Sequence, residues 1–69
     1  MNPVEQDILG RKSEIIAEVN AIFKVNMKIT DWDVPEADDA LAGKMLLDIM
    51  QEALDGLKAK LDEGEFRDY

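Results

Sequence analysis

Apolar residues recur at helical spacing through the first third of the chain. They are Val4, Ile8, Ile15, Val19 and Ile22, and Leu9, Ile16 and Phe23 widen the same stripe. Asn2, Pro3 and Glu5 predict the start of a helix, because Asn can cap, Pro suits the first helical position and Glu completes a capping box. A glycine inside a helix costs about 1 kcal/mol relative to Ala. We therefore expect a helix over about 3–24 that bends or frays near Gly10.

Residues 25–33 are predicted to be a hinge. Asn26 can take the left-handed conformation that ends many helices. Over residues 25–30 apolar and polar side chains alternate, which is typical of an extended segment. A short strand is therefore one expectation for these residues. A single strand in a chain of this length has no internal partner, so it would pair with another copy or another protein.

A second helix is predicted over about 34–63. Asp33 can cap it, Pro35 suits its first turn and Glu36 follows at the third position. Its apolar seam repeats every seven residues and is thickened by intervening apolar positions. The seam consists of Ala40, Leu46, Leu47, Met50, Ala53, Leu54, Leu57 and Leu61. Gly64 is expected to stop the helix, and residues 65–69 form a tail in which Phe66 and Tyr69 could pack back.

Small residues mark one line of the second helix. Ala37, Ala40 and Gly43 follow one another at intervals of three. Helix propensity explains the two alanines. Gly43 needs another reason inside a helix, and we expect another segment to approach closely there.

These elements predict an all-α fold, a two-helix antiparallel hairpin in a single domain of residues 1–64. A core of this size rarely supplies more than about 3–5 kcal/mol. The hairpin is expected to bury the face of Leu46, Leu47, Met50, Leu54 and Leu57. A second line of Leu41, Met45 and Ile49 then needs cover. Three solutions are open: a closed monomer, another protein as cover, or a dimeric four-helix bundle, which we favour.

Charge is distributed unevenly along the chain. Residues 1–29 contain four acids and four bases, whereas residues 30–69 contain twelve acids and four bases, so the net charge of -8 belongs to the second part. This charge argues against nucleic acid and anionic membranes as partners. The acids could form a solvated face, a patch for a basic protein, or a cation site. The densest group is Asp31, Asp33, Glu36, Asp38 and Asp39.

Composition narrows the chemistry further. The chain has no Cys and no His, so cysteine nucleophiles, imidazole bases and thiolate metal sites are excluded. The acidic group does not match a calcium loop, because Pro35 and Glu36 stand where a ligand and a Gly are needed. We therefore expect neither an enzyme nor a metal or other cofactor. No unbroken apolar run exceeds three residues, and no basic leader precedes Glu5, so the expected location is the cytoplasm.

Trp32 is the most informative single side chain. Its ring could close the hairpin core, or it could be an exposed anchor, since interfaces favour Trp. The function predicted from the sequence is a non-catalytic protein–protein interaction module, a small acidic accessory subunit or regulator that forms a homodimer or binds a basic protein surface. The alternative is an acidic inhibitor that imitates nucleic acid in a basic groove. The predicted interaction residues are Trp32, Leu41, Met45, Ile49, Asp31, Asp33, Glu36, Asp38 and Asp39.

Overall fold

The protein is all-helical in the computed structural model, which describes residues 2–36 and 38–67. Its helices are α1 (Pro3–Gly10), α2 (Lys12–Asp33) and α3 (Asp39–Asp62). The expectation of an all-α fold is therefore confirmed.

The start of α1 is capped as the sequence predicts. The Asn2 side chain accepts a hydrogen bond from the Glu5 backbone N–H at 2.8 Å, and its amide donates to the Glu5 carboxylate at 2.9 Å. Pro3 occupies the first helical position. The first of these bonds satisfies one backbone donor that the first turn would otherwise leave free, and the second joins the two side chains.

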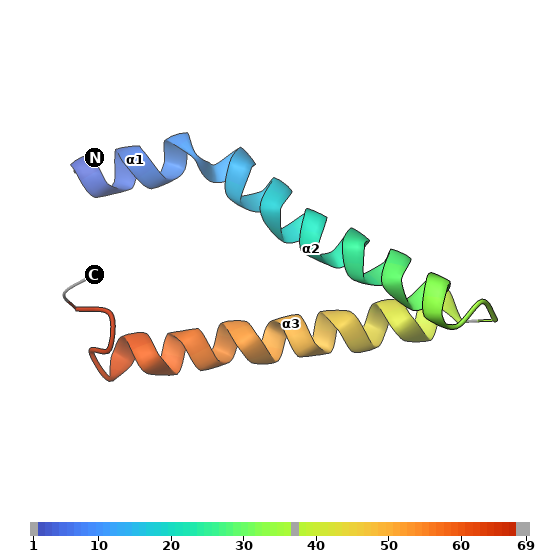
Figure 1. Ribbon diagram of the computed structural model, residues 1–69. Coiled ribbons are helices and arrows are strands. Elements are labelled where there is room, and N and C mark those ends of the chain that lie inside the picture. Colours follow the sequence, from blue (N-terminus) through green and yellow to red (C-terminus); the bar gives the residue numbers. More distant parts are fainter. Residues whose placement is uncertain (1, 37, 68–69) are drawn as a thin grey trace.

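The helix is interrupted after Gly10, where the sequence predicts a bend. Arg11 leaves helical geometry, with φ -106° and ψ 8°, and its N–H donates to the carbonyl of Ile8 at 3.0 Å. Its guanidinium also reaches Asp7 at 3.0 Å. Figure 1 shows that α1 and α2 consequently run in different directions.

The predicted strand and hinge at residues 25–33 are wrong, because α2 continues through them to Asp33. Asn26 does not end the helix. Its side-chain amide donates to the Ile22 carbonyl at 2.8 Å, one turn earlier. The chain reverses later, between Val34 and Asp38.

The start of α3 also lies later than predicted. The cap is Asp38 and not Asp33, since the Asp38 carboxylate accepts from the backbone N–H groups of Ala40 at 3.0 Å and Leu41 at 3.1 Å. Pro35 belongs to the turn before it. At the other end α3 stops at Asp62, and Gly64 adopts φ 82°, as expected of a glycine that terminates a helix.

The helices are arranged as a V. α2 and α3 run antiparallel, lie close together beside the turn and diverge toward the opposite end, where both termini lie (Figure 1). The molecule measures 49 × 27 × 17 Å, with a radius of gyration of 16.0 Å. A compact domain of this length would have a radius of about 11 Å. No described residue is fully buried, so the V has a contact zone rather than a closed core.

Candidate interaction surfaces

The contact zone of the V lies in its turn-proximal half. Within the helices, the partly covered residues are all found at positions 23–30 of α2 and 42–50 of α3. The ring of Phe23 lies against Gly43, where an added Cβ would stand 3.6 Å from Phe23 Cζ. Another segment does approach Gly43, as expected, but an alanine would make only an ordinary contact there, so this approach does not require a glycine. Ala37 lies outside the described residues.

The seam that the sequence assigns to the interior is only partly covered. Leu46 and Met50 are half-buried, but Leu47, Leu54 and Leu57 each expose about half of their surface. The prediction that all five are buried internally is wrong. The reason is geometric, because α2 and α3 diverge away from the turn (Figure 1), and every residue from Gln51 to Glu63 is exposed.

A wholly apolar pocket of about 210 Å³ opens where the two helices begin to separate. We call this pocket the mouth. It is lined by Val19 and Ile22 from α2 and by Met50, Ala53 and Leu54 from α3. Because both helices contribute, a side chain entering the mouth would contact both arms of the V at once.

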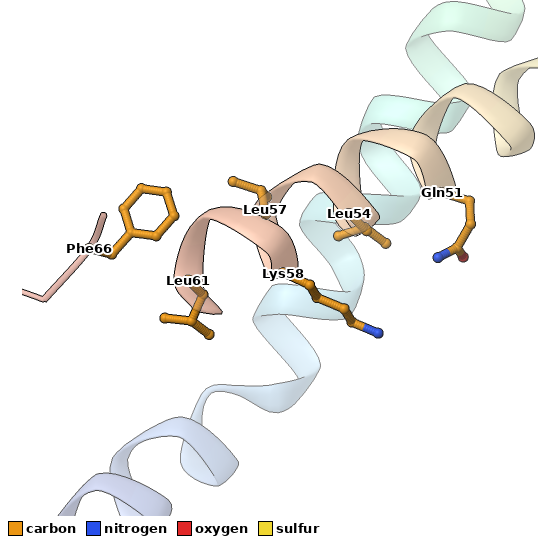
Figure 2. A pocket seen from close by; sticks show the side chains of 6 residues that line it. All are labelled: Gln51, Leu54, Leu57, Lys58, Leu61 and Phe66. Atoms are coloured by element: carbon orange, nitrogen blue, oxygen red, sulfur yellow. The ribbon is translucent and has the colours of Figure 1, made fainter. Parts of the chain in front are cut away.

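A second apolar hollow, of about 420 Å³, follows the C-terminal half of α3. Figure 2 shows Leu54, Leu57 and Leu61 along the helix, with the Phe66 ring turned back toward its end. Gln51 and Lys58 provide its polar edge. The expectation that the tail packs back therefore holds for Phe66, whereas Tyr69 lies outside the described residues.

Trp32 lies on the last turn of α2, with 87% of its surface exposed. The interpretation that its ring closes the hairpin core is wrong. Trp32 instead joins Val25 and Ile29 in a shallow pocket of about 360 Å³, edged by Lys28 and Asp33. The interpretation as an exposed anchor is the one compatible with this position.

The second apolar line of α3 is open to solvent. Leu41, Met45 and Ile49 expose 55–58% of their surface. Leu41 and Met45 also line a groove of about 230 Å³ beside the turn, together with Val34. No neighbouring element among the described residues covers this line, so the need for cover that the sequence predicts persists in the fold.

Two of the predicted acidic residues meet across the turn. The Asp39 carboxyl, hydrogen-bonded to Asp31, raises the pKa of Asp31, with smaller contributions from loss of solvent and from charge repulsion. The other acids have separate places. Asp33 ends α2, Glu36 lies in the turn and Asp38 caps α3. Within residues 2–36 and 38–67, no group of three or more acidic side chains is placed to hold a metal ion.

Sequence reasoning missed the outer face of α2. Val25 and Ile29 stand seven and three residues before Trp32, a spacing that places all three on one side of a helix. Val25 and Ile29 also fit the alternation of a strand over residues 25–30, which is why the sequence predicts an extended segment there. Recognising the helix would have placed Trp32 within a patch rather than at the end of a core.

Comparison with family models, with curated proteins and with solved structures gives no significant match. Among the described residues, none of the helices combines the length and the apolarity that crossing a bilayer requires.

Proposed function

We propose that the protein is a non-catalytic protein–protein interaction module, a small acidic accessory subunit or regulator. The observation that supports this most directly is the exposure of its apolar side chains. Eighteen large apolar residues among those described expose between 39% and 87% of their surface. Exposed apolar surface on this scale is typical of proteins that bind another polypeptide, and this supports the proposal.

The proposed partners are a second copy of the chain, in a dimeric four-helix bundle, and a protein with a basic surface. The two are compatible, because the exposed surfaces lie in different places. The mouth faces between the arms, whereas Trp32 and the line through Leu41, Met45 and Ile49 point elsewhere. Acidic residues beside Trp32 would favour a partner pocket rimmed by Lys or Arg, mainly by accelerating association.

A second candidate function is an acidic inhibitor that occupies a basic groove. The observation in its favour is that residues 31–39 contain five acids and no base, and that two of these acids lie close enough for Asp39 to raise the pKa of Asp31. Phosphate groups on a nucleic acid backbone present comparable crowding of negative charge. Binding of this kind would depend on charge far more than on Trp32.

Affinity capture from the cells that produce the protein, followed by mass spectrometry, tests both functions. The tagged wild type is compared with Trp32→Ala and with a triple variant in which Asp33, Glu36 and Asp38 are replaced by Asn, Gln and Asn. An interaction module should retain its partner at high salt and lose it with Trp32→Ala. An acidic inhibitor should lose it at high salt and with the triple variant. If no protein is captured specifically, interaction with a different protein is refuted.

A further inference from the structure

We infer that a second copy of this chain covers the open half of the V, in a two-fold dimer in which the turn of each copy lies beside the open end of the other. This inference rests on the proposed function and names the partner of one surface, the mouth and the arms beyond it. Three observations support it: the exposed surface area of the chain, the tapered shape of the V and the distribution of charge along it.

The exposed area is what an obligate dimer requires. The chain exposes 6227 Å². A folded monomer of 7.8 kDa would expose about 4,400 Å². The excess is roughly 1,800 Å² for each chain, or about 3,600 Å² for two copies. Interfaces of obligate homodimers bury roughly 2,000–5,000 Å².

The excess lies mainly on the arms. Every residue from Asn2 to Ile22, and every residue from Gln51 to Glu63, is exposed. Both stretches contain the apolar faces of their helices. They include Val4, Ile8, Leu9, Ile15, Ile16, Val19 and Ile22 on one arm, and Leu54, Leu57 and Leu61 on the other. The surface that needs cover is therefore one continuous region on either side of the mouth.

The taper of the V selects the orientation. The molecule is narrow beside the turn and wide at the end where the termini lie (Figure 1). Two copies with their turns at the same end would place both open ends side by side and leave both gaps unfilled. With the turns at opposite ends, the narrow part of one copy stands beside the wide part of the other, and each mouth can receive apolar side chains from its partner. A two-fold axis makes the two contacts identical.

Charge favours the same orientation. Residues 31–39 around the turn contain five acids and no base, a net charge of -5. Residues 2–12 and 58–67 at the open end contain five of the eight bases and five acids, a net charge of zero. Turns at the same end would bring ten carboxylates together. Turns at opposite ends separate the two acidic groups by nearly the 49 Å length of the molecule, several times the screening length of about 8 Å at physiological salt.

The first part of the test measures the mass of the protein in solution and asks whether dimer formation depends on a residue that lines the mouth. Sedimentation equilibrium of the wild type should give twice 7.8 kDa. Leu54→Gln, in the mouth, should weaken the dimer at least tenfold. Leu41→Gln is the comparison, because the same residue type on the same helix is similarly exposed but lies outside the mouth, beside the turn, so it should weaken the dimer less than Leu54→Gln does. Circular dichroism shows whether each variant remains helical. A wild type that is monomeric, or equal weakening by both variants, would overturn the inference.

The second part measures the orientation. The chain has no cysteine, so Glu36→Cys adds a single attachment point for a nitroxide in the turn. Pulsed electron resonance should then give a distance near the 49 Å length of one chain. A distance under half of that would place the turns together and overturn the inference, while the proposed interaction function would stand. The proposed function fails separately, if the chain is monomeric and affinity capture also yields no partner.

Discussion

The aromatic ring of Phe23 lies on Gly43, and this contact between α2 and α3 holds the closed end of the V. The space beyond the glycine is sufficient for one methyl group, since an added Cβ would stand 3.6 Å from Phe23 Cζ. Glycine inside a helix is unfavourable relative to alanine. Replacing the glycine with alanine would therefore stabilise the protein.

Gly43→Ala is expected to raise the free energy of unfolding by about 1 kcal/mol, from helix propensity and added contact with Phe23. Urea unfolding followed by circular dichroism measures it. Gly56→Ala is the control, because nothing lies within 4 Å of its added Cβ, so its gain should come from propensity alone. A loss of stability with Gly43→Ala would show that the two helices pack more tightly than described.

Asp31→Asn should stabilise the protein at neutral pH, because it removes a carboxylate from beside Asp39. The folded-state pKa of Asp31 is raised, so the folded protein binds this proton more strongly than the unfolded chain does. The resulting stabilisation is fully present below the unfolded pKa of about 3.9 and is lost as pH rises through the raised value. Thermal unfolding across acidic pH measures it. Asp48→Asn, elsewhere on α3, should leave this pH dependence in place.

Asp38→Ala should cost about 1 kcal/mol, because the carboxylate that accepts from Ala40 and Leu41 is lost. The first turn of α3 should fray, which backbone NMR shifts would detect. Asp33→Ala is the comparison. If Asp33→Ala instead frays the start of α3, the cap lies where the sequence first suggested.

Trp32→Ala should change the free energy of unfolding by less than about 0.5 kcal/mol, as is usual for exposed positions. Trp32 is the sole tryptophan, so fluorescence reports its surroundings directly. Its emission should be that of a water-exposed indole and should be quenched readily by acrylamide. A strongly shielded emission in the wild type would mean that another chain already covers this patch.

The sequence predicted the ends of the molecule better than its middle. Asn2, Gly10 and Gly64 act through local geometry, so capping and helix-breaking preferences were sufficient to place them. The prediction of an extended segment over residues 25–30 was wrong, because a helix with apolar side chains on two faces can show the same alternation as a strand. Met27 faces the contact zone, while Val25 and Ile29 lie beside Trp32 on another side. Alternation cannot distinguish this arrangement from an extended chain.

The sequence predicted some of the residues that form the candidate interaction surfaces, but it did not predict how far these surfaces extend. The exposure of Leu41, Met45 and Ile49 followed from a simple count of apolar faces. The mouth could not be predicted in this way, since it depends on the angle between α2 and α3. The packing of Phe23 against Gly43 fixes the two helices relative to each other at one end only. Similarly, Pro35 and Glu36 make Asp33 the stronger cap in the sequence, yet Asp38 is the residue that caps α3.

Concentrating the helix–helix packing at one end has a consequence for hydrogen exchange. In a single copy, amide protons near Met27 and Leu46 lie where both helices are covered, and they should exchange slowest. Protection should fall with distance from the turn, so that α1 and the last turns of α3 open first. A chain that docks on the arms would reverse this gradient, and the region of greatest slowing would mark where it binds.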